Sequence, residues 1–128
     1  MFRAGHILWG PFPTGERKDR PCIVLIDEQP DGRVLFSYAS TKLDFLADRT
    51  VILAPGCHPH ITQDSCVVYE EAMLVNAAAL KKAVGVLYTF NEMDILNQGA
   101  IDDLQAGIDK SDLTPEAVRN YARTLGVI

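Results

Sequence analysis

One short segment of the chain gathers residue types that can bind a metal. Cys57, His58 and His60 are followed closely by Asp64 and Cys66, and thiolate and imidazole are the ligands that zinc prefers. Structural zinc sites draw paired ligands from two short motifs, and here only Cys57 and His60 are spaced as such a pair. A cysteine and histidine nucleophile pair has no supporting motif either. We therefore expect no metal here, but a loop with exposed histidines and a buried, apolar Cys66.

Short strands joined by Gly- and Pro-rich turns are expected up to residue 90. The run 22–26 is apolar on both faces, as in a central strand, and Pro30-Asp31-Gly32 predicts a hairpin turn. The expected strands are 6–9, 21–27, 33–39, 50–53, 65–69, 72–75 and 83–89. Alternatively, 65–69 and 72–75 form one strand with a bulge between them. With no long helix expected among them, they favour a small antiparallel barrel or sandwich over an α/β sheet.

Beyond residue 90 the spacing of apolar residues changes to that of helices. From Met93 to Ile108 they recur at intervals of three and four. Asn91 offers a cap, and the acidic residues after it suit the first turn of a helix. A second helix is predicted to begin at Pro115 and to end at Gly126.

Length and composition fit one domain. A chain of 128 residues that is 48% apolar can fill a single core. We expect one domain over 1–128, with a barrel over 1–90 and a helical appendage over 91–128. The net charge of -5 gives no general attraction to nucleic acid or anionic membranes. Seven of the 17 acidic residues but only three of the 12 basic ones fall in 91–128, so the expected barrel is close to neutral.

The cysteines and the amino terminus bear on the compartment. Cys22, Cys57 and Cys66 form an odd set, and the chain does not open on the apolar stretch of a signal peptide. No apolar run approaches the length of a membrane-spanning helix. We therefore expect a cytoplasmic protein without a membrane partner.

Several short motifs between residues 5 and 87 occur in an order that is informative. Residues 5–13 read Gly-His-Ile-Leu-Trp-Gly-Pro-Phe-Pro, and residues 15–25 read Gly-Glu-Arg-Lys-Asp-Arg-Pro-Cys-Ile-Val-Leu. The apolar pieces 64–68, 73–80 and 84–87 come after them in order and spacing. This pattern of Gly-x-Ile, a Phe/Pro loop, Arg-Pro and an apolar strand resembles the PemK/MazF family of toxin ribonucleases.

The resemblance covers roughly residues 5–108 and implies an SH3-like β-barrel followed by a helix. Family members cleave RNA with the arginine of Arg-Pro and a hydroxyl at the end of the third strand. The matching positions here are Arg20 and Ser40, with Thr41 as the alternative if the register shifts by one residue. A proton acceptor is not evident, because the local carboxylates Glu16 and Asp19 have no derivable geometry.

Those residue types suit metal-independent cleavage. The 2′-OH of RNA can attack the neighbouring phosphorus, which leaves a 2′,3′-cyclic phosphate and a free 5′-OH. A guanidinium can hold two phosphate oxygens while negative charge builds, and a hydroxyl can donate to the same oxygens. Arg17, Lys18 and Lys42 would line the phosphate track, with Phe12 and Tyr38 as stacking faces for unpaired bases.

The resemblance further implies a homodimer that binds single-stranded RNA without a cofactor and is held inactive by a cognate antitoxin peptide. A noncatalytic SH3-like module that binds a peptide or protein in the same groove is the alternative function. Taken without the resemblance, Arg20 is a surface residue pairing with Asp19 or Asp27. Ser40 and Thr41 are then a strand-ending turn or a helix cap.

Overall fold

The computed structural model describes residues 1–14 and 18–128. Its strands join in one antiparallel sheet, in the order β4-β5-β3-β2-β1-β7, with β6 also paired to β3. The strands are β1 (His6–Pro11), β2 (Asp19–Ile26), β3 (Arg33–Ser40), β4 (Ile52–Leu53), β5 (Ser65–Val67), β6 (Met73–Asn76) and β7 (Asn91–Ile95). The helices are the 3-10 turn η1 (Tyr69–Glu71), α1 (Ala77–Gly85), α2 (Gln98–Lys110) and α3 (Glu116–Thr124).

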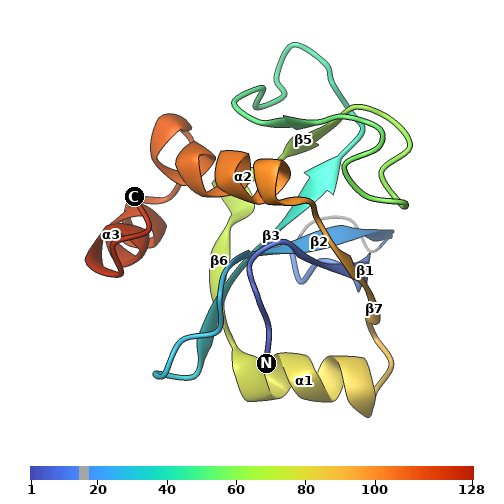
Figure 1. The fold of residues 1–128 in the computed structure, drawn as a ribbon, viewed down its shortest axis with the longest axis vertical. Coiled ribbons are helices and arrows are strands. Elements are labelled where there is room, and N and C mark those ends of the chain that lie inside the picture. The colour runs from blue at the N-terminus through green and yellow to red at the C-terminus, as the bar shows by residue number, and fades with distance from the viewer. Residues whose placement is uncertain (15–17) are drawn as a thin grey trace.

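The long strand β3 makes the sheet curl. Its first half pairs with β6, where Phe36 lies opposite Met73, and its last residues pair with β5, where Ser40 lies opposite Cys66. Because two strands share one edge of β3, the sheet bends into a half-barrel around it (Figure 1). This curled antiparallel sheet with C-terminal helices confirms the predicted fold class.

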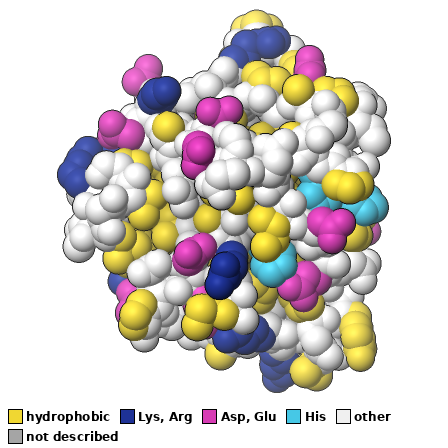
Figure 2. Space-filling model, in the orientation of Figure 1, with side chains coloured by type: hydrophobic (Ala, Val, Ile, Leu, Met, Phe, Trp, Pro, Cys, Tyr) yellow, Lys and Arg dark blue, Asp and Glu magenta, His cyan; other side chains and the backbone are white. Residues whose placement is uncertain are grey.

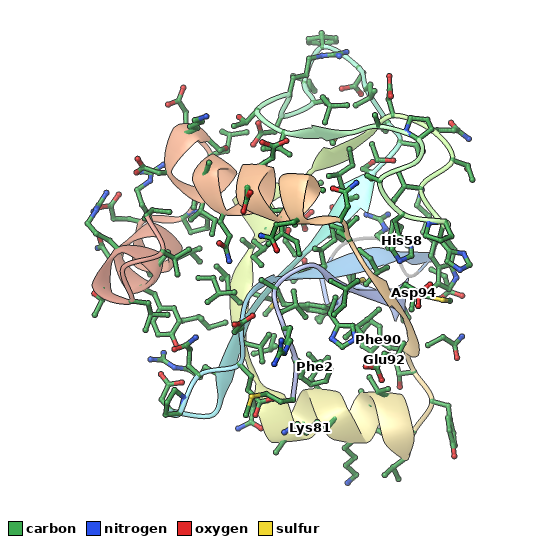
Figure 3. The ribbon with its side chains drawn as sticks, viewed as in Figure 1. Phe2, His58, Lys81, Phe90, Glu92 and Asp94 are labelled. Atoms are coloured by element: carbon green, nitrogen blue, oxygen red, sulfur yellow. The ribbon has the colours of Figure 1, made fainter. Side chains whose placement is uncertain are left out.

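Helices cover both faces of the central strands, which explains why β2 is apolar on both sides. On one face Ile23 packs in a cluster with Leu104 of α2 and Val118 of α3. On the other face Val24 belongs to a second cluster with Leu80 of α1. Figure 3 shows two further members of that second cluster, Phe2 and Phe90, on the side of the sheet where α1 lies.

Helix α1 was not expected, and the predicted strand over 83–89 is wrong. The side chain of Asn76 caps α1 by accepting a hydrogen bond from the Ala79 N–H at 2.9 Å. The segment it caps reads Ala-Ala-Ala-Leu-Lys-Lys-Ala, which are strong helix formers. The apolar run over 84–87 that suggested a strand is the end of this helix followed by exposed Val86 and Leu87.

The predicted helix start at Asn91 is also wrong. Residues 91–95 form β7, which pairs with β1 so that Glu92 lies opposite Leu8. Helix α2 begins later, where the Asn97 side chain accepts from the Ala100 N–H at 2.8 Å. The apolar residues spaced at three and four from residue 93 onward therefore belong first to a strand and then to a helix. Only those in α2 owe their spacing to a helix.

Helix α2 is held on the core by Tyr69. The Tyr69 side chain is fully buried, and its hydroxyl donates to the Leu104 carbonyl at 2.8 Å. Helix α3 follows, with Pro115 as its N-cap, close to the predicted start. No helix formed by the described residues is long and apolar enough to cross a membrane.

Candidate functional site

The register between β2 and β3 places Arg20 and Ser40 together. Cys22 lies opposite Tyr38, and Ile23 lies opposite Ser37. Extending this antiparallel register to the end of β3 sets Arg20 opposite Ser40. Residues that are opposite in adjacent strands project from the same face of the sheet, so both side chains face one side.

Both residues line one shallow cleft with a volume of about 230 Å³. The residues around this cleft, called the Arg20 cleft below, are Trp9, Lys18, Asp19, Arg20, Pro21, Ala39, Ser40, Thr41 and Lys42. Its lining carries three basic side chains and one acidic one. Asp19 is the single carboxylate among the described residues that line it. Basic side chains thus outnumber acidic ones in the lining of this cleft, and one of them, Lys42, also lies 3.8 Å from Asp44 Oδ2.

Charge elsewhere on the surface is mixed. Figure 2 shows acidic and basic side chains interspersed over one face of the molecule, with apolar side chains among them and no large area of a single sign. A general electrostatic attraction to nucleic acid is therefore not a property of that face. Any preference for phosphate has to come from local arrangements such as the Arg20 cleft.

The Arg20 side chain lies over the ring of Tyr38. The guanidinium carbon of Arg20 lies 4.4 Å from the centroid of the Tyr38 ring, a distance typical of cation–π contact. Tyr38 is only 6% exposed, and its ring also contacts the Phe12 ring at 4.8 Å between centroids. The aromatic face under Arg20 is therefore part of the core.

Glu71, which the sequence did not indicate as functional, completes this arrangement. The Tyr38 hydroxyl donates to Glu71 Oε2, and the Thr14 hydroxyl donates to Glu71 Oε1 at 2.9 Å. The sequence suggested only a bulge at Glu70-Glu71, since no local motif links residues so far apart. Curling of the sheet brings η1 to the end of β3 and creates the contact.

The two candidate hydroxyls have different surroundings. The Ser40 Oγ accepts a hydrogen bond from the Lys42 N–H at 3.2 Å, so the strand-ending turn considered for this residue is present. A serine oxygen that accepts such a bond still has its own proton to donate. Thr41 lies just beyond the end of β3 and is exposed. Both line the cleft, but only Ser40 occupies the strand position opposite Arg20.

The remaining predicted binding residues differ in whether they are exposed at the cleft or buried in the core. Lys18 and Lys42 are exposed and line the cleft. Phe12 is 3% exposed and packs against Phe36 at 5.5 Å between ring centroids, so its expected role as a stacking face is wrong for this conformation. Arg17 and Glu16 lie outside the described residues.

The segment 57–66 is organised by hydrogen bonds. His58 is 2% exposed, so the expectation of exposed histidines is wrong for this residue, whereas His60 is exposed. The His58 Nδ1 accepts from the His60 N–H at 3.0 Å, and its Nε2 lies 2.6 Å from the Asp94 carbonyl oxygen. Figure 3 shows His58 beside Asp94 of β7. These contacts tie the loop to the sheet edge and leave neither ring nitrogen for a metal. Within the described residues, no three His, Cys, Asp or Glu side chains are grouped to hold one.

The cysteines are poorly suited to nucleophilic chemistry. Burial raises the pKa of Cys22 to about 12, and its thiol donates to the Gly10 carbonyl at 3.4 Å. Burial also raises the pKa of Cys57 and of Cys66. Because the thiolate is the reactive form, all three stay protonated near neutral pH and none is a candidate nucleophile.

Tyr38 gives the fold a predictable response to alkaline pH. Burial, and then the hydrogen bond to Glu71, raise its pKa from 10.0 to about 12. Between these values the unfolded chain has lost a proton that the folded chain keeps, so stability is full below pH 10 and falls as pH rises toward 12. Urea unfolding across this range should show a smaller loss for Tyr38→Phe. Equal losses in the two proteins would contradict the assignment.

The geometry defines a curled antiparallel half-barrel with a basic cleft at the ends of β2 and β3. No family model matches this chain, and no curated protein sequence matches it. A chain in the crystal structure of MazE-MazF (Form-III) from Deinococcus radiodurans superposes with a TM-score of 0.56 at 12% identity, over 85% of this chain and 94% of that chain. The fold is therefore MazF/PemK-like, as the sequence motifs predicted.

Proposed function

We propose that this protein is a metal-independent endoribonuclease of the toxin type that cleaves single-stranded RNA in the Arg20 cleft. The observation that carries the proposal is that Arg20 and Ser40 both line one cleft in which basic side chains outnumber acidic ones. An arginine fork and an alcohol set side by side suit the oxygens of one phosphodiester. The MazF-like fold supports the assignment.

The proposed reaction is an internal transfer. The ribose 2′-oxygen forms a bond to phosphorus and loses its proton, while the bond from phosphorus to the 5′-oxygen breaks and that oxygen gains a proton. Arg20 and Ser40 would stabilise the phosphate oxygens on which negative charge builds. Asp19 on the cleft wall is the candidate proton acceptor, because a carboxylate can take up the 2′-OH proton within reach of the cleft.

The assembly that we propose is a homodimer whose clefts are covered by a cognate antitoxin peptide, in the cytoplasm. Support comes from the solved MazE-MazF structure, which is a complex of two different proteins. Positive side chains at the rim, Lys18 and Lys42, would attract an acidic peptide as they would attract RNA. A shared surface would explain inhibition by competition.

The direct test is incubation of the purified protein with single-stranded RNA in excess EDTA, beside a DNA strand of the same sequence. We expect RNA fragments that end in a 2′,3′-cyclic phosphate, and intact DNA, because DNA lacks the attacking 2′-OH. Intact RNA at all protein concentrations, with no growth arrest on expression, would overturn the proposal.

A paired substitution separates the two hydroxyls. Ser40→Ala is expected to lower the cleavage rate by about 100-fold, the usual cost of removing one preorganised donor. Thr41→Ala should stay within about threefold of the unsubstituted protein, because Thr41 lies past the strand position opposite Arg20. Single-turnover rates on one labelled RNA measure both. The reverse ranking would assign the role to Thr41.

A second groove favours the alternative function, a noncatalytic module that binds a peptide. It shares Ser40 and Lys42 with the Arg20 cleft and is walled by apolar Leu46 and Leu113. Its carboxylates, Asp44, Asp48 and Glu70, outnumber that one lysine. Carboxylates repel phosphates but attract basic side chains, so this groove fits an apolar peptide segment that carries lysine or arginine. Binding of such a peptide by a protein that leaves RNA intact would favour the module.

A further inference from the structure

We propose that Tyr38 and Glu71 are positioning residues that hold the Arg20 guanidinium in place before substrate binds. The inference rests on the proposed function, and it adds to that function two residues that would not touch RNA themselves. It starts from one chain of contacts: Thr14 to Glu71, Glu71 to Tyr38, and Tyr38 to Arg20.

Strand geometry puts the aromatic ring within reach of the cation. Tyr38 lies opposite Cys22, two residues further along β2 than Arg20, so Arg20 and Tyr38 are diagonal neighbours on one face of the sheet. Long and aromatic side chains can bridge that diagonal. The observed 4.4 Å between the guanidinium carbon and the ring centroid shows that they do.

The ring is itself fixed from several sides. Phe12 packs against it at 4.8 Å between centroids, and Glu71 accepts the hydrogen bond of its hydroxyl. Burial and this bond raise the pKa of Tyr38 to about 12, so the hydroxyl remains a donor at neutral pH. A phenol that donates to a carboxylate gains electron density, which strengthens the attraction of its ring for a cation.

Such a support has a specific benefit for phosphate binding. An arginine side chain free in solution has many rotamers, and ordering it on a ligand costs entropy. A cation–π contact is not itself a hydrogen bond, so the ring face attracts the guanidinium in addition to any hydrogen bond that its N–H groups make. Tyr38 would thus act through Arg20, on the step in which charge develops.

The test compares Tyr38→Leu with the conservative Tyr38→Phe. We expect Tyr38→Leu to lower kcat for RNA cleavage by about 10-fold with little change in KM, and Tyr38→Phe to retain activity within about threefold because the ring face remains. In the Arg20→Ala background, Tyr38→Leu should have no further effect. The same loss in both backgrounds, or full activity of Tyr38→Leu, would overturn the inference.

The chain offers a matched control at a distance from the cleft. The Arg33 guanidinium carbon lies 4.6 Å from the Tyr121 ring centroid, and the Tyr121 hydroxyl donates to Asp31 at 3.0 Å, so an arginine, a tyrosine and a carboxylate meet there as well. Tyr121→Leu should leave kcat unchanged. A loss of kcat as large as that of Tyr38→Leu would show that any such pair matters only through stability, which contradicts a positioning role.

A measurement without RNA separates this inference from the proposed function. In the NMR spectrum, the Arg20 Nε–H signal of the unsubstituted protein should show a ring-current shift that Tyr38→Leu abolishes. Glu71→Ala should reduce this shift about as much as Tyr38→Phe does, because both changes remove the hydrogen bond between Glu71 and the Tyr38 hydroxyl. A Glu71→Ala protein whose Arg20 signal is unchanged overturns the role of Glu71, whether or not RNA is cleaved. A protein with the expected Arg20 signal that leaves RNA intact would instead contradict the ribonuclease.

Discussion

An Arg20→Ala protein is expected to cleave RNA at least about 100-fold more slowly than the unsubstituted protein, while keeping its fold. Arg20 contributes the only guanidinium among the described residues that line the cleft. Its positive charge does not titrate at neutral pH, and its planar fork can meet two phosphate oxygens at once. Because the stabilised charge exists mainly in the transition state, the loss should appear in kcat rather than in KM.

The control and the conservative change make that result specific. Arg33→Ala removes a more exposed guanidinium that pairs with Asp31 at 2.9 Å, remote from the cleft, and it should cleave RNA at the normal rate. Arg20→Lys keeps the charge but loses the fork, so we expect it to stay well below the unsubstituted rate. Cleavage by Arg20→Ala at the unsubstituted rate would mean that the activity belongs to another site or to a contaminant.

Gly107→Ala is expected to lower the free energy of unfolding by about 3 kcal/mol, the upper part of the usual range for overpacking a core. A Cβ at residue 107 would stand 2.6 Å from Val51 Cγ2 and would overlap the Tyr69 side chain. Tyr69 is fully buried and is bonded to the Leu104 carbonyl, so it cannot move aside without losing that bond. Helix α2 would have to shift. Urea unfolding at constant pH measures the change.

Gly99 supplies the control within the same helix. A Cβ there would meet only Asn97 Oδ1, at 3.6 Å, an ordinary contact. Alanine has the higher helix propensity, so Gly99→Ala should be neutral or stabilising by up to about 1 kcal/mol. Equal stabilities of the two alanine variants would show that α2 does not press on Tyr69 as the structure has it.

The fold class could be predicted because β1, β2 and β3 carry their signals locally. The run 22–26 is apolar on both faces, and the Pro30-Asp31-Gly32 turn sets the β2–β3 hairpin. The run 84–87 misled for the same local reason. Its apolar side chains suggested a strand. The Asn76 cap and the alanines that follow that cap instead start helix α1, which continues into this run.

The site divides in a similar way. Arg20 and Ser40 could be named from motif positions, and the hairpin that joins them is local. Glu71 could not be named from the sequence, because its contact with Tyr38 depends on how far the sheet curls at β3. Phe12 was misassigned for the converse reason. From the sequence, an aromatic residue in a Pro-rich loop is expected to be exposed. Only the structure shows that the Phe12 ring packs against Phe36.

The central claim is that Arg20 and Ser40 together grip a phosphodiester while the RNA's own 2′-OH breaks it. The most direct measurement is the mass of fragments released from a single-stranded RNA in excess EDTA. The account predicts a 2′,3′-cyclic phosphate on one fragment and a 5′-OH on the other, with the yield of both strongly reduced by Arg20→Ala and by Ser40→Ala. Fragments that carry a 5′-phosphate, or fragments made equally well by the Arg20→Ala protein, would contradict it.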